Sequence, residues 1–141
     1  MEEDFGNRRK SLLIRSPFLY FVHLDIDSDH EGEFNQRYGT EHIPAMLTVP
    51  GVTSAVRYVT YESEVQRYLA IYGFNESGIT ETSRWKESSG VGQWPHRIRP
   101  YFKNQQSVEY ESMGVHITND LKETPYIFVV RLDVTLDHEN E

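Results

Sequence analysis

The chain has 141 residues, of which 38% are hydrophobic and 13% aromatic, and its formal net charge is −8. This length suits one domain, and the acidic balance argues against a nucleic-acid partner and against an anionic membrane surface. The absence of cysteine excludes disulfides, thiolate catalysis and cysteine-ligated metals, and it suits a reducing, cytoplasmic compartment.

The first clear element in chain order is a strand over 18–26, because the segment FLYFVHLDI is rich in aromatic and β-branched residues. Alternation places one set of side chains on a face suited to packing under helices: Tyr20, Val22, Leu24 and Ile26. The opposite face mixes apolar side chains with His23 and Asp25. If that face lines a cavity, His23 and Asp25 form a proton-handling pair.

A helix is predicted to follow, since Ser28 and Asp29 suit an N-cap and early carboxylates favour a helix start. Gly39 weakens this helix, and Pro44 cannot donate a backbone N–H. We therefore expect a break near 39–43, with a second short helix after it.

The remaining pattern predicts a hairpin of strands over 52–61 and 67–74, a weak helix over 82–88 and an irregular stretch over 90–100. Further strands are expected over 107–113 and 125–134. This order predicts an α+β fold, a ferredoxin-like βαββαβ sandwich with an extra C-terminal strand. The sheet's second face is apolar and needs a cover, which a second copy of the sheet provides as a homodimer or higher homo-oligomer.

The expected organisation has three parts: a flexible lead-in at 1–16, the ferredoxin-like domain at 17–118, and a linker with the extra strand at 119–141. The last part repeats the beginning, because residues 125–141 match residues 17–33 without a gap at eight of 17 positions. Fixed-offset self-similarity marks duplication. We therefore expect 125–141 to be the start of a truncated second repeat, and its strand to add to a sheet edge, in the same subunit or in a partner.

The segment from Phe34 to Tyr58 reads FNQRYGTEHIPAMLTVPGVTSAVRY. Its Glu-His-Ile-Pro, Val-Pro-Gly and Arg-Tyr pieces resemble the signature of EthD-like members of the dimeric α/β-barrel proteins. The resemblance covers about residues 18–112, and it implies a ferredoxin-like fold that pairs sheet to sheet. Such barrels host cyclases, isomerases and oxygenases as well as members of unknown function, so the fold does not select one reaction.

Three residues are candidates for proton chemistry. His42 lies at the predicted helix break, and its imidazole could take or give a proton near neutral pH. Tyr38 and His23 are the other catalytic candidates. The structural alternatives, a packed helix kink for His42 and a cavity-lining role for His23, remain open.

Four further residues are candidates for substrate binding: Arg57, Tyr58, Glu41 and Arg97. Arginine offers a cationic fork and tyrosine a phenolic donor to an enolate, phenolate or carboxylate. The spacing of the six histidines predicts no metal site, and no cofactor motif is present. The sequence thus favours a small-molecule enzyme of the cyclase, isomerase or oxygenase type with an apolar or aromatic ligand; a non-catalytic assembly or ligand-binding module is the alternative.

Overall fold

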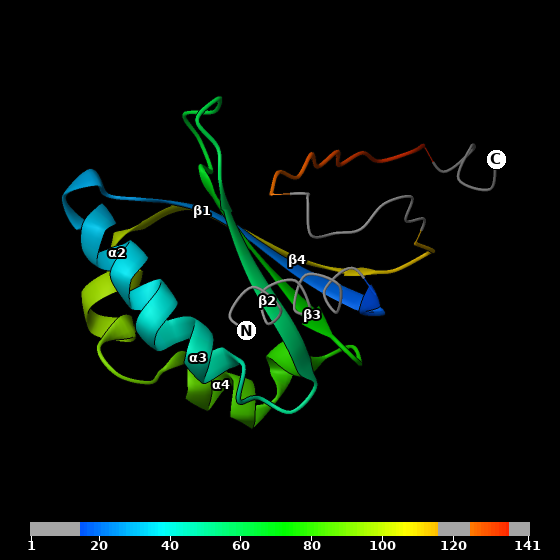
Figure 1. Ribbon diagram of the computed structural model, residues 1–141, viewed down its shortest axis with the longest axis horizontal. Helices are drawn as coiled ribbons and strands as arrows, with labels where there is room; N and C mark the ends of the chain where they lie inside the picture. The colour runs from blue at the N-terminus through cyan, green and yellow to red at the C-terminus, as the bar shows by residue number, and fades with distance from the viewer. Residues whose placement is uncertain (1–14, 116–124, 136–141) are drawn as a thin grey trace.

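The computed structural model describes residues 15–115 and 125–135 (Figure 1). Four strands form one antiparallel sheet in the order β2-β3-β1-β4: β1 (Phe18–Ile26), β2 (Val52–Val59), β3 (Tyr68–Phe74) and β4 (Phe102–Glu111). The helices α2 (Glu31–Arg37), α3 (Ile43–Met46) and α4 (Ser83–Ser89) cover one face of this sheet (Figure 1). The predicted α+β, ferredoxin-like fold is confirmed. No helix within the described ranges is long and apolar enough to span a membrane.

The core lies between the sheet and the helices. The side chains of β1 that alternation assigns to this side are its more buried set, and Leu24 is 2% exposed. Phe34 of α2 is fully buried among the rings of Tyr38, Tyr68, Trp94 and Phe102. Aromatic packing of this density removes a large apolar area from water and fixes how α2 sits on the sheet.

The predicted helix break takes the form of a π-helical turn, η2 (Tyr38–His42), between α2 and α3. The backbone N–H of Ile43 donates to the carbonyl of Tyr38, so the chain stays helical through Gly39 and up to Pro44. The wider turn places Pro44 in the first turn of α3, where a missing N–H costs least.

Two stretches differ from the expectation. The segment over 90–100 contains a second π-helical turn, η4 (Trp94–Ile98), whose Trp94 and Ile98 are buried. Strand β4 begins at Phe102, five residues before the predicted strand, because its polar first half pairs with β1 at the sheet edge. An edge strand tolerates polar side chains that hydrophobic alternation does not detect.

The β2–β3 hairpin is held by the carboxylate of Asp25. Its oxygens accept hydrogen bonds from the backbone N–H groups of Gln66 at 2.6 Å and Arg67 at 2.8 Å, and from the Asn104 amide at 3.0 Å. Burial acts to raise the pKa of Asp25, but these hydrogen bonds outweigh it and hold that pKa below its ordinary value. The expected proton-handling pair with His23 is therefore wrong for Asp25, whose oxygens are committed to the hairpin.

Replacing Asp25 with alanine should lower the free energy of unfolding by about 1–3 kcal/mol, because two backbone donors lose their acceptor. Urea denaturation of Asp25→Ala beside Glu109→Ala, an exposed change on β4, measures this. Equal midpoints for the two variants would contradict the assignment.

The segment over 125–135 is assigned to no strand and crosses the open face of the sheet, opposite the helices (Figure 1). The predicted extra strand is thus not hydrogen-bonded into the sheet or added to its edge. The lead-in at 1–16, apart from Arg15 and Ser16, and the linker before 125 lie outside the described residues, as do the repeat positions after 135.

Candidate functional site

The candidate site is built on one face of α2. Glu31, Asn35 and Tyr38 follow the helical spacing i, i+4, i+7, which aligns their side chains toward the β2–β3 hairpin. Tyr68, the first residue of β3, donates its hydroxyl to the carboxylate of Glu31 and accepts from the Asn35 amide at 3.2 Å. These contacts join the helix to the first residue of β3, an interior strand of the sheet.

Arg57 of β2 points into this junction. Its guanidinium carbon lies 4.1 Å from the centre of the Tyr38 ring and 5.1 Å from that of Phe34. Its one hydrogen bond to a side chain goes to Asn35 Oδ1 at 2.9 Å, and none of the carboxylates within the described ranges forms an ion pair with it. Burial lowers the pKa of Arg57, while the neighbouring tyrosines act to raise it. The side chain is therefore a half-buried cation with no ion-pair partner among the described residues.

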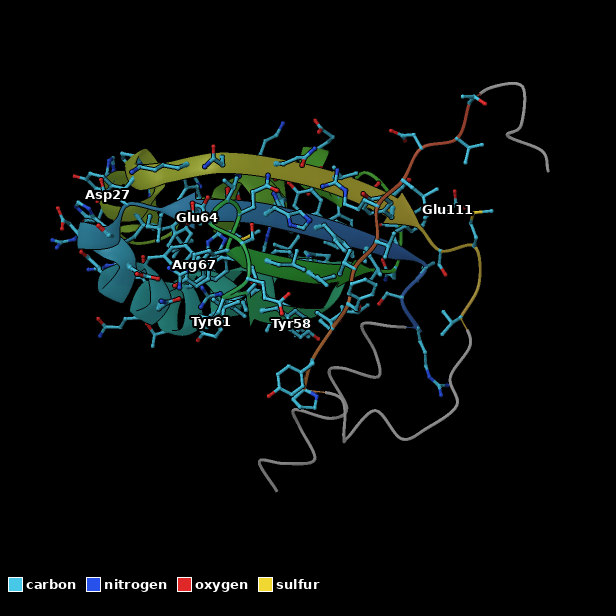
Figure 2. The ribbon with its side chains drawn as sticks, turned by 90° about the horizontal axis from the view of Figure 1, so that it is seen from above. Asp27, Tyr58, Tyr61, Glu64, Arg67 and Glu111 are labelled. Carbon is cyan, nitrogen blue, oxygen red and sulfur yellow. The ribbon has the colours of Figure 1, made fainter. Side chains whose placement is uncertain are left out.

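A cavity of about 360 Å³ opens beside this guanidinium. It is lined by Glu31, Asn35, Arg57, Tyr58, Val59, Tyr61, Arg67 and Tyr68. In Figure 2, Tyr61 and Arg67 lie near the end of the β2–β3 hairpin that borders the cavity. Arg67 Nη1 lies 3.5 Å from Glu31 Oε1, so these two charges offset each other. The charge of Arg57 is therefore not offset by Glu31.

The structure brings the predicted residues Tyr38, His42 and Arg57 into one cluster. The His42 ring stacks on Trp94 with centroids 4.3 Å apart and meets Tyr38 edge-on at 5.2 Å. Burial, followed by the charges of Arg99 and Arg57, lowers the pKa of His42 to about 3. His42 is thus a neutral ring packed in the helix layer near neutral pH, and it does not line the Arg57 cavity.

Tyr38 itself is buried, and its hydroxyl lies 3.4 Å from the Tyr72 hydroxyl. Burial raises the pKa of Tyr38, while Tyr72 and Arg57 act in the opposite direction. The phenol is therefore neutral and can donate or accept a hydrogen bond. Because the Arg57 guanidinium lies over the Tyr38 ring, this ring stabilises the cation through a cation–π contact.

The sheet separates His23 from this cluster, whereas Tyr58, on the edge strand β2, faces the open side and also borders the Arg57 cavity. In register, His23 is paired with Leu69, which is also opposite Tyr58, so all three side chains share the open face. They line a second cavity of about 750 Å³ beneath the segment over 125–129. Burial and then the charge of Arg131 lower the pKa of His23. His23 and His42 thus lie on opposite faces of the sheet and do not form one site.

Glu41 and Arg97 are engaged in holding η4. Glu41 accepts from the backbone N–H groups of Gln93 at 2.8 Å and Trp94 at 3.1 Å, and from Arg37 at 2.8 Å. The Arg97 guanidinium donates two hydrogen bonds to the Glu33 carboxylate, from Nε at 2.5 Å and from Nη2 at 3.2 Å. Neither residue reaches the Arg57 cavity, so their predicted role in substrate binding has no geometric support.

The Glu33 interactions predict a pH dependence of stability. Hydrogen bonds from Arg97, then from Arg37, lower the pKa of Glu33 from 4.5 to about 2. The stabilisation is present above pH 4.5 and is lost as the pH falls through about 2. Thermal denaturation between pH 5 and pH 2 should show a shallower decline for Glu33→Gln than for the parent chain. Glu87→Gln, on the exposed surface of α4, should decline like the parent, and a Glu33→Gln curve parallel to the parent's would contradict the assignment.

Sequence reasoning missed Glu31, Asn35, Arg67 and Tyr68 as site residues. The helical spacing of Glu31, Asn35 and Tyr38 was a usable signal for the first two. Nothing local marks Tyr68 and Arg67, because their place beside α2 arises from the antiparallel pairing of β3 with β1. No group of three metal-ligating side chains occurs in the part of the chain that the structure describes.

In sequence, the chain matches no family model and no curated protein. In structure, it is similar to the haem degrader MhuD from Mycobacterium tuberculosis, solved with two haems bound in its active site (TM-score 0.55, 12% identity, 72% of this chain and 100% of that one). It is also similar to an EthD family protein from Bacillus halodurans (TM-score 0.51, 13% identity, 68% and 99%). A third similar structure is a putative antibiotic biosynthesis monooxygenase from Bordetella bronchiseptica (TM-score 0.51, 10% identity, 70% and 99%).

Each of these proteins is matched over nearly its whole length. At identities of 10–13%, this structural similarity establishes the architecture and leaves the chemistry to the site. The chain thus has the ferredoxin-like fold that these structures share.

Proposed function

We propose that this protein binds a small ligand that combines an anionic group with an apolar or aromatic body, in the cavity between α2 and the β2–β3 hairpin. The observation that carries the proposal is Arg57, a half-buried guanidinium beside a cavity of about 360 Å³ with no ion-pair partner in the described ranges. A charge removed from water without a counter-ion is costly, and a bound carboxylate, phenolate or enolate would offset that cost.

The rest of the cavity suits the remainder of such a ligand. Tyr58, Tyr61 and Tyr68 provide aromatic surface, and Arg57 can exchange its bond to Asn35 Oδ1 for one to the anionic oxygen of the ligand. A guanidinium binds a carboxylate through two parallel hydrogen bonds, which fixes the ligand's orientation as well as its charge. The cavity volume limits the ligand to a small molecule.

The similar structures include a haem degrader and a putative monooxygenase, which supports small-molecule chemistry in this fold. The residues that line the Arg57 cavity do not fit a haem, because they include no histidine, cysteine or methionine and the Tyr68 hydroxyl is already held by Glu31 and Asn35. A reaction at this site would use Arg57 to stabilise negative charge that develops on an enolate or phenolate oxygen.

A thermal-shift screen of matched pairs tests the proposal, each pair being an aromatic carboxylate and its uncharged amide. The carboxylates should raise the melting temperature at millimolar concentration, and the amides should raise it less or not at all. Equal responses within every pair would remove the anion-binding role of Arg57.

A second proposal concerns assembly. The open face of the sheet carries apolar side chains from three strands, among them Phe21, Ile71 and Val108, and a sheet face of this kind is stabilised by a second apolar layer. We infer that two copies of the chain pair through this face as a homodimer. Sedimentation velocity over a range of concentrations should show a dimer, and a monomer at all concentrations would contradict the inference.

A further inference from the structure

We propose that residues 125–135 compete with dimerisation of the chain. They lie on the open face of their own sheet, in the place that β1 of a second copy takes in a face-to-face dimer. The proposal rests on the homodimer inferred above and is independent of the Arg57 cavity. Its evidence is the agreement between the repeat in the sequence and the side of the segment that contacts the sheet.

The repeat aligns each residue of β1 with one residue of the segment, 108 positions later. The positions of β1 on the open face are Leu19, Phe21 and His23, and their counterparts are Ile127, Val129 and Arg131. The helix-facing positions of β1 correspond to Phe128, Val130, Leu132 and Val134. If the segment acts as a second β1, its first set should face the sheet and its second set should face away.

The structure has this arrangement. Ile127 is 42% exposed and Val129 is half-buried, whereas Phe128 is 89% and Val130 64% exposed. Arg131 donates to Gln106 Oε1 at 2.9 Å, and Gln106 is paired with His23 across β1 and β4. The segment therefore presents to the sheet the same side that β1 of a second copy would present.

The two occupants exclude each other. Sheets that pack face to face lie about 10 Å apart, which leaves no room for an intervening segment. The segment covers the face incompletely, since large apolar side chains of its outer side remain exposed and cavities of about 910 and 750 Å³ lie along it. A second sheet buries more apolar surface, so it displaces the segment once the protein concentration is high enough.

Adjacent residues of the segment supply the test in the full chain. Val129→Asp places a charge against the sheet, whereas Val130→Asp places the same charge on the outer side. Sedimentation velocity should show that Val129→Asp lowers the apparent dissociation constant of the dimer about tenfold or more. Val130→Asp should leave it unchanged.

If the parent and both variants dimerise with equal affinity, pairing holds and the competition is wrong. If Val129→Asp weakens the dimer, the segment supports assembly and the proposal is overturned. If all three remain monomeric, the homodimer inferred above fails and the competition fails with it.

The chain contains no cysteine, so a single cysteine introduced at position 129 or 130 gives a second test of which side of the segment faces the sheet. At low protein concentration, the thiol introduced by Val129→Cys should react with a maleimide more slowly than that introduced by Val130→Cys. At concentrations where the dimer forms, the difference should disappear because the segment leaves the face. Equal rates at low concentration would show that the segment does not occupy the sheet.

Discussion

Replacing Phe34 with alanine is expected to lower the free energy of unfolding by about 3–5 kcal/mol, the range typical of a buried aromatic side chain. Phe34 is fully buried, and its ring contacts four other aromatic rings from η2, β3, η4 and β4. The loss therefore combines buried apolar area with several favourable ring contacts. Urea denaturation followed by far-UV circular dichroism measures it.

Two controls separate this effect from a general sensitivity of the chain. Phe34→Leu keeps most of the volume and should cost less than Phe34→Ala. Val91→Ala, at a side chain that is 49% exposed, should change the free energy of unfolding by about 0.5 kcal/mol or less. A Phe34→Ala cost as small as that of Val91→Ala would contradict the packing described here.

The second large effect concerns Arg57. Arg57→Met should weaken binding of a carboxylate hit by about 1.5–3 kcal/mol, or roughly ten- to a hundredfold in the dissociation constant. The stability of the ligand-free protein should change by only about 1 kcal/mol, because the contact with Tyr38 and the bond to Asn35 are lost together with the cost of a desolvated charge. Titration calorimetry and urea denaturation measure the two quantities.

Arg57→Lys keeps the charge without the planar fork and should bind with intermediate affinity. Arg84→Met removes a cation from the exposed surface of α4 and should leave the affinity unchanged. A structural role for Arg57 predicts the reverse pattern, in which the free energy of unfolding falls strongly and the ligand affinity changes little. That result would contradict the proposed site.

The sequence predicted the elements whose hydrophobic pattern is strong. The strand over 18–26 was placed with its observed bounds and faces, because aromatic and β-branched residues alternate there without interruption. The break around Gly39 was also anticipated, although its form, a π-helical turn that keeps Pro44 in a helix, depends on how η2 packs.

Long-range packing accounts for what the sequence did not predict. His42 looked like a proton carrier because its residue type and position suit that role, and only the fold shows it stacked on Trp94, 52 residues later. Arg57 was identified by its type, but the absence of an ion pair with it among residues 15–115 and 125–135 depends on Glu31 being bound by Arg67 and Tyr68 instead. The segment over 125–134 reads as a strand for the same reasons as β1, yet no neighbouring edge pairs with it.

The most direct measurement is a titration of the strongest carboxylate hit from the thermal-shift screen, followed by NMR on the Nε–Hε resonance of Arg57 in the full chain. Binding in the cavity predicts that this resonance shifts and saturates with the dissociation constant found by calorimetry. A ligand that binds with that affinity while the Arg57 resonance stays in place would show that the anion is held elsewhere.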